Sequence, residues 1–454
     1  MRHILSRSVA GGGSLASLVS LALMTSAALP VSTASAATIH VMNCNDSGVG
    51  SLRGSVASAH SGDTIDLTRL RCSRIVLTSG EISITQHDLT LVGPGRSRLA
   101  IDGNHASRIF LHNGGDTMPG NLVIKSITLA NGHVPLPPGF SDPPPTGGCI
   151  NSNHNVELNG VDLHDCLVDY ESSLGSIGGG VFANGSLRLI FSNIFSNAAP
   201  GGFGGGAYAQ GDLVVYRSRI YNNHAQWGGG LLASKVSLSY STVDNNTTTR
   251  EDLNAEGGGI YSDVLVVNKS TVSNNGALGH NPDGGGATVR SLAYIYDSTF
   301  SGNVASKGTA IYGGGGDVRI FNSTIAFNQE IPGEFLTESF GAVAAGNVYA
   351  SSSIIARNRL GTGAGNDVGE GTSLRGANNL IERSATPLPA GTLSVNPLLG
   401  PLANNGGPTK THALLNGSPA IDRGNNFRHR QYDQRGPGFV RVKGTAADIS
   451  AFER

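Results

Sequence analysis

Residues 284–303 read GGGATVRSLAYIYDSTFSGN, a glycine cluster followed by a Ser-x-Phe step and, three residues after the phenylalanine, Asn303. The same step, with Ile, Val or Phe at its apolar position, recurs every 23–30 residues at Ile194, Ile220, Val243, Val272, Phe300, Ile325 and Ile355. Three residues after each of these stands an asparagine: Asn197, Asn223, Asn246, Asn275, Asn303, Asn328 and Asn358. Fixed offsets in seven consecutive units indicate an internal structural repeat.

Glycine clusters precede the repeated steps, and they account for much of the glycine in the chain, 65 of 454 residues. They occupy residues 178–180, 204–206, 228–230, 257–259, 284–286 and 313–316. A unit this short cannot bury its own apolar face, so it must stack on its neighbours. Asparagine tolerates turn conformations and can bond to the next asparagine, while glycine permits close approach of coils. The pattern predicts an all-β fold, a right-handed parallel β-helix with an asparagine ladder; the alternative, a β-propeller, needs longer blades of ~40–50 residues.

Charge and composition exclude several classes of protein. Lysine and arginine number 31 against 32 acidic residues, for a net charge of -1, so no overall field attracts nucleic acid. Gly, Ser, Thr and Asn are spread through every segment and disfavour long helices.

The N-terminal 36 residues have the pattern of a secretory signal peptide. Arg2 and Arg7 precede an apolar run over residues 15–29, and residues 34–36 read Ala-Ser-Ala, a typical cleavage site. A membrane anchor is the alternative, but the run is short for a span of ~20 residues. We expect an exported chain that begins near Ala37, has no transmembrane segment, and is secreted to the periplasm or the medium.

Export permits disulfide bonds between the four cysteines, Cys44, Cys72, Cys149 and Cys166. Three pairings are possible, and we favour the two that join nearest neighbours, Cys44–Cys72 and Cys149–Cys166. A zinc site is the competing interpretation, although no CxxC or HxxxH spacing supports it. Free buried thiols remain a further alternative.

The chain divides into four predicted regions. After the signal peptide (1–36), residues 37–110 form an N-terminal cap and the first coils, with a short helix that buries Leu52, Val56 and Ala59 and ends at Gly62. Residues 111–385 carry the repeats and are interrupted by a proline-rich loop at 135–145. Residues 386–454 form an irregular C-terminal cap.

Two resemblances support this fold. Phe300-Ser301-Gly302-Asn303 is similar to the Phe-x-x-Asn motif of polymorphic outer-membrane protein repeats, and residues 205–207 and 285–287 are similar to their Gly-Gly-Ala motif. Most units here have Ile or Val in place of Phe, so this similarity concerns the fold more than adhesion.

The two ends of the chain resemble the choice-of-anchor Q family of exported bacterial β-helix proteins. The motifs are NCNDSG at 43–48, NNGGPT at 404–409, GSPAID at 417–422 and DISAFE at 448–453. The resemblance implies that the C-terminal segment closes the solenoid. Ser450 departs from the usual glycine, and no sorting anchor follows Arg454. We therefore expect the protein to be released into the periplasm or the medium rather than covalently anchored. Non-covalent association with the cell surface is the alternative.

No catalytic residue is predicted. A glycosidase of this fold needs two or three carboxylates ~5–10 Å apart on adjacent coils, and a lyase needs a calcium site of several acids with a basic residue. None of the carboxylate or basic motifs of known β-helix enzymes occurs. His164-Asp165 is interpreted as a polar turn beside Cys166. No cofactor or metal site is predicted; the alternative is calcium bound by acidic residues of the loops.

Loops between each ladder asparagine and the next glycine cluster should stack on one side of the helix. They carry acids, histidines and aromatics: Asp169, Tyr170, Glu171, Phe203, His224, Trp227, Glu251, Asp252, Glu256, His280, Asp283, Glu330, Glu334, Phe335, Glu338 and Phe340. Trp227 with Glu251, Asp252 and Glu256 is the predicted binding centre for an extracellular carbohydrate or protein ligand. The favoured function is non-catalytic binding or adhesion; the alternative is a polysaccharide lyase or glycoside hydrolase, which would require acids to converge on neighbouring coils.

Overall fold

The computed structural model describes residues 35–454, apart from 116–118, 136–143, 170–174, 251–254, 332–339 and 361–362. The signal peptide therefore lies outside the described residues except for Ser35 and Ala36, and most of the proline-rich loop lies outside them too. Within the described part, no helix is long and apolar enough to cross a membrane. The boundaries at 110 and 385 stay predictions.

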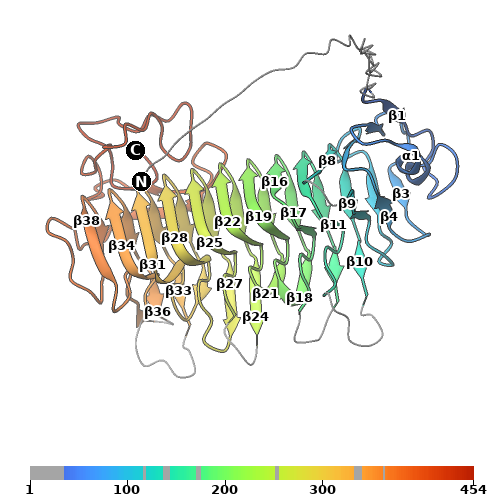
Figure 1. Cartoon of the computed structure of the whole chain (residues 1–454). Coiled ribbons are helices and arrows are strands. Elements are labelled where there is room, and N and C mark those ends of the chain that lie inside the picture. The colour runs from blue at the N-terminus through green and yellow to red at the C-terminus, as the bar shows by residue number, and fades with distance from the viewer. Residues whose placement is uncertain are drawn as a thin grey trace, which may run out of the picture. The chain divides into compact units, whose positions relative to one another are not determined.

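Three sheets wind around a common core as a right-handed parallel β-helix, which confirms the predicted fold (Figure 1). Sheet B contributes one short strand per coil: β3 (Arg74–Val76), β6 (Ala100–Asp102), β9 (Thr128–Ala130), β13 (Asp162–His164), β17 (Asn193–Phe195), β20 (Arg219–Tyr221), β23 (Thr242–Asp244), β26 (Thr271–Ser273), β29 (Thr299–Ser301), β32 (Thr324–Ala326), β35 (Ile354–Ala356) and β39 (Leu380–Ile381). Sheet C contains β10 (His133–Val134), β14 (Leu167–Val168), β18 (Ala198–Phe203), β21 (His224–Trp227), β24 (Thr247–Arg250), β27 (Gly276–Gly279), β30 (Val304–Ala305), β33 (Gln329–Glu330), β36 (Arg359–Leu360) and β37 (Gly363–Ala364), of which the last runs antiparallel to β36.

Sheet A begins as two narrow ladders and becomes one broad sheet from β19 onward. Its strands are β1 (Thr38–His40), β2 (Thr64–Asp66), β4 (Ile82–Ile84), β5 (Asp88–Val92), β7 (Phe110–His112), β8 (Asn121–Lys125), β11 (Ile150–Ser152), β12 (Asn155–Asn159), β15 (Val181–Ala183), β16 (Leu187–Ile190), β19 (Ala207–Tyr216), β22 (Leu231–Ser239), β25 (Ile260–Asn268), β28 (Ala287–Tyr296), β31 (Ile311–Phe321), β34 (Val343–Ser351) and β38 (Ser373–Ala377). Both β15 and β16 pair with β19, which continues them as a single strand.

The apolar residue of each repeated step lies in sheet B and points into the core. Ile194 is in register with Ile220, and the pairing continues without a shift through Val243 and on to Ile355. All seven of these side chains are fully buried. Successive steps therefore stack one above the other, as the constant offsets in the sequence require.

The asparagines three residues later form a continuous ladder inside the turn. Each side-chain amide donates to the Oδ1 of the next asparagine at 2.9–3.0 Å, and each backbone N–H donates to the same oxygen. Cys166 N–H donates to Asn197 Oδ1 at the first rung, and Asn358 donates to Asp367 Oδ1 at the last, 2.7 Å away. A disulfide cysteine and a buried aspartate thus end the ladder.

A second ladder, which the sequence analysis did not predict, is built from the serine of the same step. The backbone N–H of Ser192 donates to Ser218 Oγ, and five further bonds of 3.1–3.2 Å continue this pattern to Ser353. Ser353 N–H donates in turn to Asn379 Oδ1. The serine recurs in every unit because its hydroxyl satisfies a buried backbone donor of the preceding coil.

Glycine is required where the coils approach most closely. Gly228 has φ +61°, and a Cβ on Gly229 would lie 2.4 Å from the carbonyl oxygens of Gly258 and Thr247 in the next coil. One glycine cluster was assigned wrongly: residues 313–316 lie inside β31, at a register irregularity. The turn of that coil begins instead at Gly308, whose φ is +53°.

The N-terminal end is closed by α1 (Leu52–Ser58) and a disulfide. Ser51 caps the helix, and Leu52 and Val56 are buried beneath it. The C-cap is Ala59 in an extended conformation, so the prediction that Gly62 ends the helix is wrong. Both predicted disulfides, Cys44–Cys72 and Cys149–Cys166, are present.

The C-terminal segment packs against the outer face of sheet B rather than only covering the last coil. It contains a hairpin of β40 (Leu399–Ala403) and β41 (Thr411–Leu414), and lies beside the later coils in Figure 1. Thr271 Oγ1 donates to the Lys410 carbonyl, and Ala451 N–H donates to Thr324 Oγ1. Threonines on this face are therefore buried although they point away from the core.

Candidate functional site

The residue immediately before each glycine cluster forms a row along the helix axis, called here the pre-glycine row. Parallel bridges join its successive members, which are Thr146, Ile177, Phe203, Trp227, Glu256, Asp283 and Lys307. After Thr146 and Ile177 the row contains two aromatic residues and then two acids, and it ends in a cation. Two of the four predicted binding residues, Trp227 and Glu256, are direct neighbours in it; Glu251 and Asp252 lie outside the described residues.

Both faces of the Trp227 indole are covered. Phe203, one coil earlier, stacks on it with ring centroids 4.8 Å apart and planes within 10°. The Arg250 guanidinium of the following coil lies 4.2 Å from the ring centroid. Because the solenoid places equivalent residues directly above one another, the indole offers a ligand its edge rather than a face.

A groove runs between the pre-glycine row and the outer face of sheet A. Tyr208, Leu232 and Tyr261 are in register on β19, β22 and β25, and line it together with Phe203 and Trp227. The cavity has a volume of about 660 Å³. Polar groups at its rim are Gln210, Ser234, Asp263 and Arg290, with Arg290 Nη1 3.7 Å from Asp263 Oδ1.

Two carboxylates meet beside this groove on neighbouring coils. Glu256 and Asp283 are register partners, a relation that places parallel residues ~4.8 Å apart. Asp283 is only 4% exposed, and its Oδ1 has no hydrogen-bond partner among the described residues. Two acidic residues thus occupy register positions on neighbouring coils, and the sequence analysis assigned only Glu256 to its binding centre.

Burial controls the protonation of this pair. Desolvation raises the pKa of Asp283 to about 7; the Lys307 charge opposes this effect, and the Glu256 charge adds to it. Burial also raises the pKa of Glu256, against the charges of Arg290 and Arg250. Asp283 thus holds a proton through most of the acidic range, beside the more exposed Glu256.

We expect Asp283→Asn to weaken the pH dependence of stability. The folded-state pKa of Asp283 is raised, so the folded protein binds more protons than the unfolded chain between about pH 4 and pH 7. Its free energy of unfolding must fall as pH rises through that window, by up to about 1.4 kcal/mol per pH unit. Urea unfolding at pH 5 and pH 7 should show a smaller difference in Asp283→Asn than in the wild type. The surface variant Asp263→Asn is the control, and an unchanged difference in Asp283→Asn would contradict the assignment.

His164 is the last residue of β13, and Asp165 lies in the bend that follows it, so the polar turn interpreted from the sequence begins at Asp165. His164 Nδ1 lies 2.7 Å from Asp165 Oδ2, and the imidazole stacks on Phe195 at 4.6 Å. Asp165 has a positive φ of 53° and precedes the disulfide residue Cys166. Across the described residues, no group of three or more His, Cys, Asp or Glu side chains is placed to hold a metal ion.

No family model matches the chain, and no curated protein matches it. A crystal structure of "pectate lyase Pel9A" superimposes with a TM-score of 0.45 at 14% sequence identity, over 92% of this chain and 97% of that one.

Proposed function

We propose that the protein binds a glycan chain in the groove beside Trp227, at or outside the cell surface. The observation that carries this proposal is the 660 Å³ groove, in which side chains from successive coils lie in register. Ligand sites of this kind have volumes of ~300–1,000 Å³ and combine apolar walls with a few polar groups. Because equivalent positions repeat every ~4.8 Å along the helix, the groove suits an extended polymer better than a compact ligand.

The lining chemistry supports a carbohydrate. Tyr208 and Tyr261 provide partly exposed aromatic surface, and Gln210 and Ser234 provide neutral donors and acceptors for hydroxyl groups. The Asp263–Arg290 pair adds a charged donor and a charged acceptor that can each bond to sugar oxygens. Trp227 contributes the edge of its ring at the wall.

We expect Tyr261→Ala to weaken glycan binding at least tenfold, since it removes one of the aromatic rings that line the groove. Isothermal titration calorimetry against a panel of neutral and acidic polysaccharides measures this directly. Tyr221→Ala, which removes a ring from sheet B on another face, should bind like the wild type. Equal binding by Tyr261→Ala and the wild type would exclude this groove as the site.

Hydrolysis of the bound glycan is the second candidate, because Glu256 and Asp283 are paired on neighbouring coils. Retaining glycosidases hold their two carboxyl groups ~5–5.5 Å apart, close to the spacing of adjacent coils. Asp283, with its raised pKa, would act as the acid and Glu256 as the nucleophile. Reducing-end release by the wild type that falls at least a hundredfold in Glu256→Gln, but not in Glu157→Gln on β12, outside the groove, would establish hydrolysis. If the wild type releases no reducing ends from any glycan that it binds, hydrolysis is excluded and Glu256 and Asp283 have a structural role only.

We infer further that the chain is exported and related to the choice-of-anchor Q proteins. The terminal motifs at 43–48, 404–409 and 448–453 support the relation. The two disulfides support an oxidising compartment, since such bonds are rare in the cytosol. Fractionation of producing cells, with N-terminal sequencing for a start near Ala37, tests the export.

A further inference from the structure

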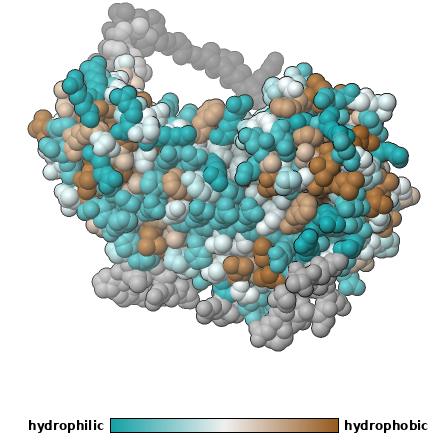
Figure 2. Space-filling view, turned by 180° about the vertical axis from the view of Figure 1, so that it is seen from behind, coloured by the Kyte–Doolittle hydropathy of each residue, from teal (hydrophilic) through white to brown (hydrophobic). Residues whose placement is uncertain are grey.

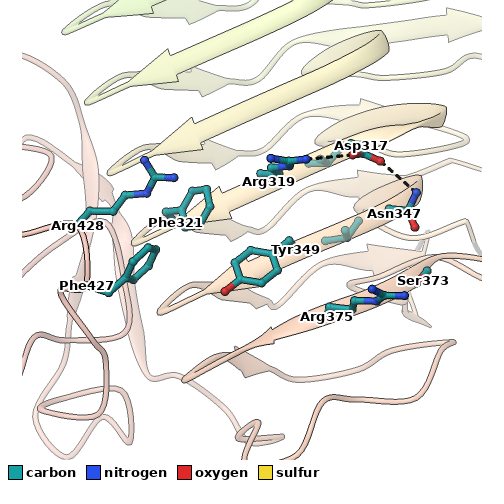
Figure 3. A pocket seen from close by; sticks show the side chains of 11 residues that line it. Asp317, Arg319, Phe321, Asn347, Tyr349, Ser373, Arg375, Phe427 and Arg428 are labelled. Atoms are coloured by element: carbon teal, nitrogen blue, oxygen red, sulfur yellow. Dashed lines mark hydrogen bonds and ion pairs between the residues drawn. The ribbon is translucent and has the colours of Figure 1, made fainter.

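A second groove lies where the outer face of sheet A meets the C-terminal segment, and the sequence analysis assigned no residue to it. Three sheet A strands form its floor, with Arg319 and Phe321 from β31, Tyr349 from β34 and Arg375 from β38. Phe427 and Arg428 of the C-terminal segment form its wall, as Figure 3 shows. Its volume is about 590 Å³, and we call it the arginine groove.

The arginine groove carries an excess of positive charge. Its lining has three guanidinium groups, from Arg319, Arg375 and Arg428, against the single carboxylate of Asp317. That carboxylate is already engaged, since it accepts from Arg319 at 3.4 Å and from Asn347 at 3.1 Å. Within the described part of the chain, neither Arg375 nor Arg428 has a carboxylate partner. This excess is local, because the whole chain has a net charge of -1.

Aromatic rings, rather than acids, hold Arg428 in place. Its guanidinium lies 4.3 Å from the Phe321 ring centroid, 4.7 Å from that of Tyr296 and 5.6 Å from that of Phe427. Cation–π contact fixes the position of the group and leaves its N–H donors available for an anion.

The floor of the groove alternates charge and ring along the helix axis. Tyr349 is in register with Arg319 on one side and with Arg375 on the other, so the two cations are two strand spacings apart, about 9.6 Å. The Tyr349 and Phe427 side chains are 42% and 43% exposed. Six of the ten large exposed hydrophobic residues described belong to the C-terminal segment, and Figure 2 shows hydrophobic residues gathered toward the C-terminal coils.

We propose that the arginine groove binds an acidic glycan, a polysaccharide segment that carries carboxylate or sulfate groups. The guanidinium groups of Arg375 and Arg428 bind the acidic groups, and the exposed rings of Tyr349 and Phe427 contact the apolar faces of the sugars. The spacing of about 9.6 Å between the two cations on the floor, Arg319 and Arg375, suits a polymer with regularly placed acids. This site is separate from the groove beside Trp227, and the proposal does not depend on that groove.

The test compares two double variants with the same change in net charge. Arg375→Gln/Arg428→Gln removes the two unpaired cations of the groove, and Arg74→Gln/Arg188→Gln removes two exposed cations elsewhere. Affinity electrophoresis in polygalacturonate, dextran sulfate and neutral dextran, at low and high salt, gives the binding strength. We expect the first variant to lose at least tenfold in affinity for one or both acidic polymers, and the second to lose less than twofold.

The polymer that shows this loss identifies the acid as carboxylate or sulfate. Tyr349→Ala should weaken binding to the same polymer three- to tenfold, because the ring contacts sugar. Equal losses in the two double variants would show a non-specific charge effect and overturn the proposal, as would equal affinity for a single-stranded oligonucleotide. Tyr221→Ala, which removes a ring outside both grooves, should keep full affinity for the same polymer.

Discussion

Asn275→Ala is expected to lower the free energy of unfolding by about 3–5 kcal/mol. Asn275 lies in the middle of the ladder, where its Oδ1 accepts from both the backbone and the side chain of Asn246, and its amide donates to the Val243 carbonyl and to Asn303. All of these groups are buried, so no water can replace the lost partner. Chemical denaturation followed by circular dichroism measures the change.

Asn45→Ala provides the matched control, because Asn45 is exposed in the N-terminal loop. It should change stability by no more than about 0.5 kcal/mol. A loss below 1 kcal/mol in Asn275→Ala would mean that the ladder does not hold the coils together, and that core packing alone does so.

Arg441→Met is expected to cost about 3–5 kcal/mol and to release the C-terminal segment from sheet B. Arg441 is fully buried; its guanidinium donates to the Ser450 carbonyl at 2.9 Å and lies 3.4–3.5 Å from Glu453 and Asp297. Asp297 belongs to the solenoid, and Ser450 and Glu453 belong to the segment. Removal of the guanidinium leaves the buried carboxylates of Asp297 and Glu453 without this positive charge. The Ser450 carbonyl loses this hydrogen-bond donor.

Chymotrypsin digestion reports the release. We expect rapid cleavage of Arg441→Met after Phe427, Tyr432 or Phe439, at concentrations that leave the wild type intact. Lys443→Met, two residues away with an exposed side chain, should resist digestion as the wild type does. Resistance of Arg441→Met would show that the hydrophobic contacts of Leu414, Ile449 and Phe452 suffice to hold the segment.

The sequence predicted the coils well because a solenoid imposes constant offsets. The serine, the apolar residue and the asparagine stand at fixed distances within sheet B and its turn, where every strand except the last, β39, has three residues. The assignment failed at residues 313–316, because β31 contains an irregularity that adds residues before its apolar positions. Strand length in sheet A varies between coils, and an insertion there leaves the core pattern intact.

The candidate sites were harder to predict because they depend on which loop residues become neighbours. Glu256 and Asp283 each directly precede a glycine cluster, as Trp227 does, so their alignment could have been found from that offset. The loops that precede Glu256 and Asp283 differ in length, and this difference hid the alignment of the two residues in the sequence. No such signal exists for the arginine groove: Arg375 belongs to the last long strand pairing and Arg428 to a segment without repeats.

The most direct test of glycan binding beside Trp227 uses the residue itself, since the chain contains a single tryptophan. Fluorescence of Trp227 is measured during titration with the polysaccharide that calorimetry identifies, with acrylamide as quencher, in the Arg375→Gln/Arg428→Gln background. Our account predicts a saturable change in emission with the calorimetric Kd, and at least a twofold reduction in quenching at saturation. Saturable binding that leaves both emission and quenching of Trp227 unchanged would contradict it.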